Sequence, residues 1–277
     1  MLSLLALGSS VVWGTSDFFG GLMAKRLPAV AVVGITQSLA FVVLCIAVLV
    51  QFSLGNPPEW GSWVVWAVVA GISGTTGLVA FYTALAGGTM GVVAPIASMG
   101  VIVTVSLGVL SGESPSRWTW VGIIVAIFGI VLASGPEISG AVSPRPVVLA
   151  GVAALAFGLG LFSIDRGSRE SLLMTLWGMR LTSVTIFAVA ALALRSVGGA
   201  RRAHLLPLAA IGCADLLANV LFGTASSRGQ VSVAAVLGSL YPVATILLAR
   251  VVLKERLRRI QQVGVVLALT GAVLISL

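Results

Sequence analysis

Two carboxylates, Asp17 and Asp215, lie inside long runs of apolar residues. An aspartate at the centre of a membrane helix costs about 3 kcal/mol to insert, so its side chain should face the protein interior or a watery cavity. In a poorly solvated cavity the charged form of a carboxylate is disfavoured, which lets the group hold and release a proton. Asp215 is therefore the first candidate for a proton carrier, and Asp17 is the second.

Both aspartates belong to polar stripes with helical spacing. Trp13 lies four residues before Asp17, on the same face of the first apolar run. Around Asp215 the stripe consists of Gly212, Asp215, Asn219, Phe222 and Ser226. Such a stripe is typical of a ligand site, but polar residues also form hydrogen-bonded seams between membrane helices, and both interpretations stay open.

Several further residues approach the middle of their apolar runs, and together they indicate a central cavity. The predicted substrate-binding residues are Trp13, Asp17, Thr75, Ser98, Phe157, Asp215, Asn219 and Tyr241. We expect the aromatic members of this set to form apolar walls, and the two aspartates and the asparagine to recognise polar groups. Pro95 and Pro242 free backbone carbonyl groups in mid-membrane, which are tolerated where they face protein or a cavity.

Other charged residues in or near the apolar runs have less specific interpretations. Arg180 lies well inside a run, where it pairs with an acid or a substrate carboxylate, or else extends to the membrane interface as long basic side chains do. The charges at Asp165, Arg166, Arg169 and Glu170 are expected to form a self-neutralising loop cluster.

Two segments of the chain repeat each other. GESPSRWTWVGIIVAIFG, which ends at Gly129, resembles KERLRRIQQVGVVLALTG, which ends at Gly271. An offset of 142 residues, close to half of the 277-residue chain, also relates Glu113 to Glu255. We expect the small residues of these segments to form a helix-packing seam and the two glutamates to be structural anchors, each suited to the start of the following helix. A duplicated apolar chain is typical of a membrane transporter with its site between the halves.

The composition sets the class of protein. Hydrophobic residues make up 58% of the chain and charged residues 9%, whereas soluble proteins carry about 25% charged residues. Apolar runs of about 20 residues match the thickness of a bilayer, in which the backbone must be helical. The net charge of +8 lies in loops and suits anionic lipid headgroups rather than nucleic acid.

The apolar runs predict ten spans and short loops. The spans are expected at 2–24, 29–52, 61–85, 90–110, 118–134, 147–164, 171–194, 206–225, 231–252 and 260–277. This pattern divides the chain into a five-helix repeat at 1–134, a linker at 135–146 and a second five-helix repeat at 147–277. Because five is odd, the second repeat must have inverted topology. The expected fold is an all-α integral membrane protein with ten helices around a central cavity, large enough to work as a monomer.

The sequence does not indicate an enzyme. It contains no nucleotide-binding loop, metal cluster or nucleophile–base pair, and its one histidine, His204, has no catalytic partner in sequence. We therefore expect no cofactor and no bound metal.

The chain resembles EamA-type members of the drug/metabolite transporter superfamily. The residues that carry the resemblance are Trp13-Gly14, Pro95, Gly112-Glu113, and the stretch from Gly238 to Pro242 through Glu255, Gln262 and Gly264. The resemblance implies two inverted five-helix repeats, a cavity lined by helices one, three, four, six, eight and nine, and secondary transport of small organic metabolites, often as export. It also implies cytoplasmic termini, whereas basic residues in the loops predict the opposite orientation, so orientation stays open.

These inferences combine into one expectation and two rivals. We expect a secondary active transporter in the bacterial inner membrane that exports an amino-acid-like or drug-like molecule by alternating access. Its partners would be this small molecule, protons as the coupling ion, and membrane lipids. A passive channel or facilitator, or a membrane scaffold without transport activity, would share the composition.

Overall fold

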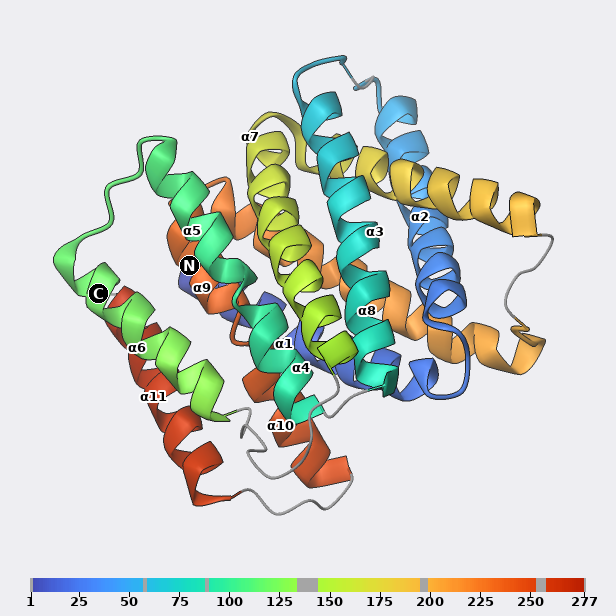
Figure 1. The fold of residues 1–277 in the computed structure, drawn as a ribbon. Helices are drawn as coiled ribbons and strands as arrows, with labels where there is room; N and C mark the ends of the chain where they lie inside the picture. The colour runs from blue at the N-terminus through green and yellow to red at the C-terminus, as the bar shows by residue number, and fades with distance from the viewer. Residues whose placement is uncertain are drawn as a thin grey trace.

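A computed structural model describes residues 2–56, 59–87, 90–133, 144–194, 199–252 and 258–276. Within these ranges the chain is all-helical and forms eleven helical segments (Figure 1). The segments are α1 (Leu2–Ala24), α2 (Ala29–Ser53), α3 (Trp63–Gly87), α4 (Met90–Ser98), α5 (Gly100–Leu110), α6 (Arg117–Ala133), α7 (Pro144–Leu194), α8 (Arg202–Ser226), α9 (Val231–Gly238), α10 (Tyr241–Val252) and α11 (Arg259–Ser276). Five of them, α1, α2, α3, α7 and α8, are long and apolar enough to cross a membrane.

Three interruptions explain why the segments differ from the predicted spans. Met99 separates α4 from α5, and Ser239 and Leu240 separate α9 from α10. α7 changes direction at Ser171, whose φ of −152° and ψ of 106° are not helical, so its two limbs diverge (Figure 1). Pro242 lies in the first turn of α10, where a missing amide hydrogen removes no helical hydrogen bond. Pro95 lies within α4, but its side chain is outside the described part, as are Glu255 and most of the predicted linker.

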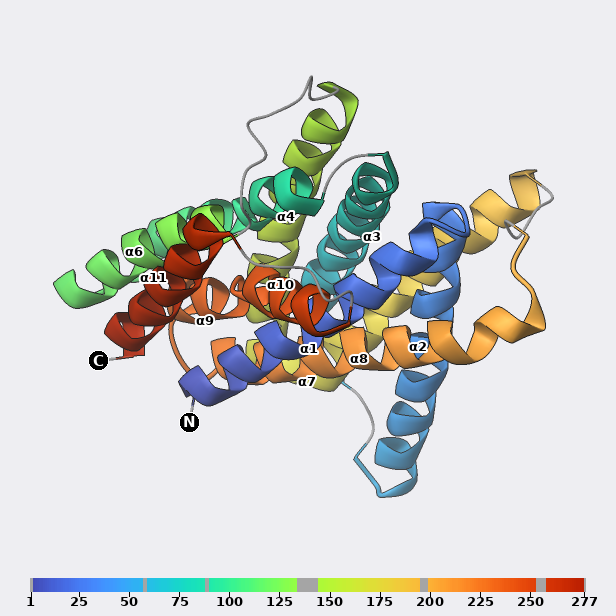
Figure 2. The same ribbon diagram turned by 90° about the horizontal axis from the view of Figure 1, so that it is seen from below.

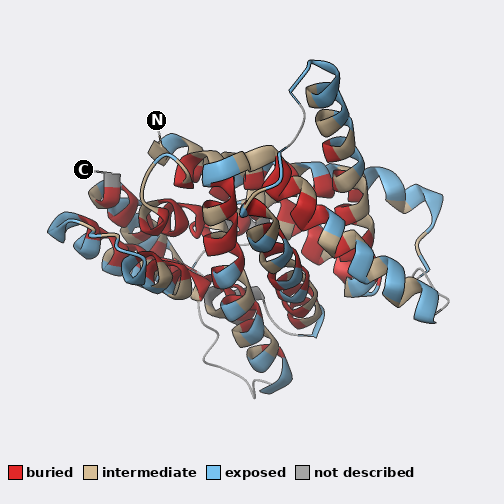
Figure 3. Cartoon of the chain, turned by 90° about the horizontal axis from the view of Figure 1, so that it is seen from above, coloured by how far each residue is buried: buried red, intermediate tan, exposed pale blue. Residues whose placement is uncertain are grey.

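The outer faces of the bundle are apolar and the packed faces exclude solvent. Figure 3 shows buried residues concentrated where helices meet, with exposed residues along outer faces and at helix ends. The exposed residues include large apolar side chains such as Leu49, Val65, Leu192 and Val266. So much exposed apolar surface would make a soluble protein associate, but it suits contact with lipid.

The repeated glycine segments form one reciprocal contact between α6 and α11, which lie side by side (Figures 1 and 2). A Cβ atom at Gly129 would meet the backbone of Ala268, and a Cβ at Gly271 would meet that of Ala126. The 142-residue offset converts the first of these contacts into the second. The structure thus confirms the predicted packing seam.

The order of contacts along the seam fixes the direction of the two helices. Gly122 approaches Ile275, near the end of α11, whereas Ala133, at the end of α6, approaches Gly264. Along the contact, residue numbers therefore increase in α6 while they decrease in α11, so the two equivalent helices are antiparallel.

Close backbone contacts also bring the two halves of the chain together. Gly100 of α5 and Gly158 of α7 leave room for each other's backbone, and Thr104 donates its hydroxyl hydrogen to the Gly158 carbonyl at 2.9 Å. On the opposite side, Gly14 of α1 lies against the backbone of α10, and Thr245 donates to the Gly14 carbonyl at 3.1 Å. α3 packs along α7, and α1 along α8. These crossings place helices of both halves around one central space.

Glu113 anchors a helix other than the predicted one. Gly112 takes a φ of +98°, a left-handed value that suits glycine and ends α5, and Glu113 follows directly. Its carboxylate accepts the backbone amide hydrogens of Val231 at 2.6 Å and Ser232 at 3.1 Å, together with the Ser232 hydroxyl at 2.6 Å. Glu113 therefore caps α9, whereas α6 is capped by Ser116, which accepts from the Thr119 amide. The expectation that Glu113 serves the following helix was wrong, because its best donors lie in the other half.

The charges that were expected in a loop belong instead to α7. Asp165 is fully buried and accepts hydrogen bonds from Arg169 at 3.0 and 3.3 Å. Arg169 also lies 3.8 Å from the Glu113 carboxylate and donates to the Gly229 carbonyl at 3.2 Å. Glu170 accepts the Trp63 amide at 2.9 Å and so caps α3. The cluster joins the halves at one end of the bundle, and the first limb of α7 extends through it to the change of direction at Ser171.

Replacement of Glu113 with alanine should lower the free energy of unfolding by about 1–3 kcal/mol, because the change leaves donors of α9 without a charged acceptor. Thermal unfolding of the purified protein in detergent measures the effect. Glu59→Ala is the matched control, since Glu59 is exposed and its loss should cost about 0.5 kcal/mol or less. Equal stability of the two variants would show that the cap at α9 contributes little.

Candidate functional site

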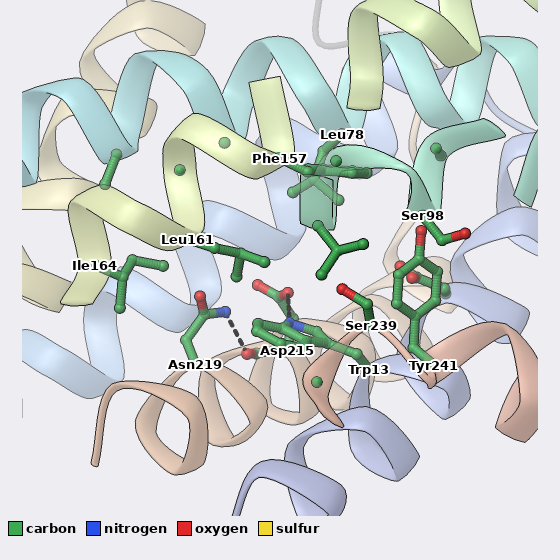
Figure 4. A pocket seen from close by; sticks show the side chains of 18 of the residues that line it. Trp13, Leu78, Ser98, Phe157, Leu161, Ile164, Asp215, Asn219, Ser239 and Tyr241 are labelled. Carbon is green, nitrogen blue, oxygen red and sulfur yellow. Dashed lines mark hydrogen bonds between the residues drawn. The ribbon is translucent and has the colours of Figure 1, made fainter. Parts of the chain in front are cut away.

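The two halves of the chain form a central cavity with a volume of about 100 Å³. The first half contributes residues of α1, α3, α4 and α5, and the second half contributes both limbs of α7 together with α8, α9 and α10. A space of this size holds several water molecules, or part of a small organic molecule. Most of its wall is apolar, and its polar groups come from a few converging side chains (Figure 4).

Seven of the eight predicted site residues line this cavity. They are Trp13, Asp17, Ser98, Phe157, Asp215, Asn219 and Tyr241. The six spans expected to line the cavity correspond to α1, α3, α4 with α5, the first limb of α7, α8, and α9 with α10, and all of them contribute residues. The second limb of α7 adds Met179 and Arg180. Helical periodicity therefore brought the correct faces together, although the contribution of this limb was not expected.

Thr75 is the predicted site residue that lies elsewhere. Its side chain is buried and donates to the Ser183 hydroxyl at 2.9 Å, in the contact between α3 and the second limb of α7. Gly71, one turn earlier on the same face, also packs against this limb. Gly74 and Leu78 of α3 line the cavity instead. Thr75 is thus part of a helix-packing seam, because it shares the face of Gly71 rather than that of Gly74.

Arg180 is buried and forms an ion pair with Asp215. The Arg180 side chain is 4% exposed, and its Nη2 atom lies 2.6 Å from Asp215 Oδ2. Nη1 donates to the side-chain carbonyl of Gln37 on α2. This geometry excludes the interpretation in which Arg180 extends to the membrane interface. A buried arginine of this kind needs both partners, because an unpaired charge in a low-dielectric interior is costly.

Gln37 contacts the site through Arg180 but is not among the residues predicted from the sequence. It is 2% exposed and lies in α2 between two other polar residues, Thr36 and Ser38. The available signal was a group of three polar residues, Thr36, Gln37 and Ser38, within an apolar run, where a buried amide is costly unless it finds a partner.

Each carboxylate oxygen of Asp215 accepts a hydrogen bond from another helix. One carboxylate oxygen accepts from Arg180, and the other accepts from Trp13 Nε1 at 3.2 Å (Figure 4). Asn219 donates its side-chain amide to the Asp215 backbone carbonyl at 2.6 Å, one turn along α8. The polar stripe on α8 thus faces the cavity and also forms hydrogen bonds between helices. The sequence left open whether this stripe is a ligand site or a seam between helices, and its geometry is compatible with both.

Asp17 has a different environment from Asp215. Within the described residues, its hydrogen-bond partner is the Tyr82 hydroxyl of α3, at 3.4 Å. No described arginine or lysine forms an ion pair with it. Asp17 is therefore the carboxylate of the cavity without a described cationic partner.

Aromatic side chains form much of the remaining wall. The Trp13 ring lies 5.6 Å from that of Phe222, and Phe81 contacts both Phe157 and Tyr241 edge-on, at 5.8 and 6.5 Å between ring centres. The Tyr241 hydroxyl is buried and has no hydrogen-bond partner among the described residues. Ser98, the last residue of α4, and Ser239, the first residue after α9, approach the same space (Figure 4).

The described residues contain no group of three acidic, histidine or cysteine side chains that could hold a metal ion. The polar groups of the cavity are suited to ion pairing and hydrogen bonding.

A multi-pass helical membrane protein whose two halves enclose a central cavity with a few polar groups is organised as a membrane transporter of small molecules. Both halves match the EamA-like transporter family, over residues 1–135 and 145–277, and the chain belongs to this family. It is a transporter rather than an enzyme, and the resemblance drawn from its sequence is confirmed.

The same fold is found in the crystal structure of another protein. That chain is 17% identical to this one, with a TM-score of 0.81 over 100% of this chain and 98% of the other. At this identity the likeness concerns the fold alone. A search of curated proteins gave no match.

Proposed function

We propose that the protein is a secondary active transporter that moves a small organic metabolite across the bacterial inner membrane by alternating access. The observation that carries this proposal is the central cavity, which is formed by both halves and contains the Arg180–Asp215 ion pair. Contacts between halves that surround a central site are what must rearrange when access alternates. We further propose that transport is export, by a monomer.

The proposed architecture is ten spans in two inverted repeats, at 1–134 and 147–277, with a linker at 135–146. On this view α4 with α5 forms one span, α9 with α10 forms another, and α7 forms two that meet at Ser171. The antiparallel contact of α6 with α11 supports inversion, because equivalent helices of inverted repeats run in opposite directions.

We propose that seven of the predicted residues contact the substrate. Trp13, Phe157 and Tyr241 supply aromatic surface, while Ser98 and Asn219 supply hydrogen-bonding groups. The two cavity aspartates are the candidates for carrying a coupling proton.

Reconstituted protein tests the proposal. A thermal-unfolding screen with amino acids, nucleosides, sugars and cationic drugs should identify a ligand, since a compound at 100 times its Kd adds about 2.7 kcal/mol to the free energy of unfolding. In proteoliposomes, uptake of that compound should saturate and should be accelerated by the same compound trapped inside. Linear flux without this counterflow would identify a channel, and no flux of any stabilising compound would favour a scaffold.

A further inference from the structure

The charged groups of the cavity do not balance. Its described side chains include two carboxylates, Asp17 and Asp215, and one cation, Arg180. Arg180 and Asp215 neutralise each other at 2.6 Å. With Asp17 ionised, the cavity therefore carries one net negative charge, and that charge belongs to Asp17.

The contacts of the two carboxylates assign them different roles. Each oxygen of Asp215 accepts a described hydrogen bond, and Arg180 already neutralises its charge, so Asp215 attracts a new cation less strongly than Asp17 does. The described ionisable groups near Asp17 on neighbouring helices are Tyr82 of α3, Tyr241 of α10 and Asp215 of α8. Arg180 lines the same cavity, and its described ion pair is with Asp215. None of these supplies Asp17 with a positive charge of its own.

The walls around this negative charge suit an organic cation. Trp13, Phe157 and Tyr241 line the cavity, and the faces of aromatic rings attract ammonium groups. Tyr241 also brings a buried hydroxyl that has no partner among the described residues. The rest of the wall is largely aliphatic, which suits an apolar body attached to the charged group.

We propose that the cavity binds a monocationic amine with an apolar or aromatic body, whose ammonium group pairs with Asp17 in competition with a proton. This inference rests on the proposed transport function and names its substrate class. Binding of the ammonium ion releases the proton from a protonated Asp17, so one positive charge replaces another. Exchange of one amine for one proton across the membrane is then electrically neutral.

A zwitterion is the alternative ligand, because the buried Nε–H of Arg180 lacks a described acceptor and suits a carboxylate. That carboxylate would lie beside Asp215 and would leave the cavity with its net negative charge. The amine removes that charge, which is why the observations favour it.

Four probes that share a phenyl ring and differ in charge test the inference: phenethylamine, phenylalanine, 2-phenylethanol and 3-phenylpropionate. Calorimetric titration of the full-length protein in detergent should show phenethylamine to bind most tightly. Its Kd should rise about tenfold for each pH unit lowered through the range in which Asp17 takes up a proton. Within that range, titrations in two buffers that differ in ionisation enthalpy should show up to one proton released per amine bound.

Two variants and a control separate Asp17 from general effects. Asp17→Asn should weaken phenethylamine binding at least tenfold and abolish its pH dependence, while Asp17→Glu should keep the pH dependence. Glu59→Gln, which removes an exposed carboxylate outside the cavity, should behave like the wild type. If Asp17→Asn does not fold, the pH dependence and the proton release of the wild type and of Asp17→Glu decide the question.

Unchanged binding by Asp17→Asn, tighter binding of phenylalanine, or no binding of phenethylamine would each overturn the amine assignment. Saturable counterflow of phenylalanine in proteoliposomes would overturn it while leaving the proposed transport function in place. Failure of counterflow for every stabilising compound in the wider screen would instead overturn the transport function itself.

Discussion

Replacement of Arg180 with methionine is expected to lower the free energy of unfolding by about 3–5 kcal/mol, the typical cost of removing one member of a buried ion pair. The side chains of Arg180 and Asp215 are 4% and 14% exposed, so solvent can compensate only part of the charge left on Asp215. The same change removes the partner of the buried Gln37 side chain. Thermal or denaturant unfolding of the purified protein measures the loss.

The double variant Arg180→Met with Asp215→Leu isolates the cause. It should recover much of the lost stability, because neither charge is then left unpaired. Arg166→Met is the matched control on the same helix, since Arg166 is 25% exposed and 4.0 Å from its acidic partner. Its loss should cost about 1 kcal/mol. A double variant no more stable than Arg180→Met would show that the unpaired charge is not the source of the effect.

Gly129→Ala should destabilise the protein by about 1–3 kcal/mol, the usual cost of overpacking a well-filled contact. The added methyl group would meet the backbone of Ala268, which cannot turn aside as a flexible side chain can. Gly271→Ala should behave in the same way, because it is the equivalent position and would meet the backbone of Ala126. Unfolding in detergent measures both.

Gly151→Ala provides the opposite expectation for the same chemical change. It lies in α7, where a Cβ atom would have nothing within 4 Å, so alanine should stabilise the helix by about 0.5–1 kcal/mol. A Gly129→Ala variant as stable as Gly151→Ala would show that α6 and α11 separate without cost.

The location of most helices could be predicted because hydropathy depends on local composition. The apolar run at 2–24 is α1, and the run at 29–52 is α2 apart from one residue. The interruption at Met99 could not be predicted, since a break of one residue leaves the apolar pattern on either side intact. The continuation of α7 through Asp165 was missed for a related reason. A cluster of charges in the sequence predicts a loop unless the residues that neutralise those charges are known.

The candidate site shows the same division between local and distant information. Spacing of three and four residues placed Asp215 and Asn219 on the cavity face of α8, as predicted. It could not decide whether Arg180 meets Gln37, 143 residues earlier in the chain, because that depends on how three helices pack. Thr75 was predicted to face the cavity, but its neighbour Gly74 does so instead. One residue along a helix rotates the side-chain direction by about a quarter of a turn, so the two residues lie on different faces.

The caps described above also set an order of events during synthesis. α3 begins at Trp63, but the carboxylate that accepts its first amide hydrogen belongs to Glu170, 107 residues later. At about 5–20 residues per second, a ribosome needs roughly 5–20 seconds to add that stretch. The cap of α9 involves no such delay, because Glu113 has already been synthesised when α9 emerges from the ribosome. Until Glu170 is synthesised, the N-terminus of α3 therefore lacks its carboxylate cap. A nascent chain released before residue 170 never acquires this cap.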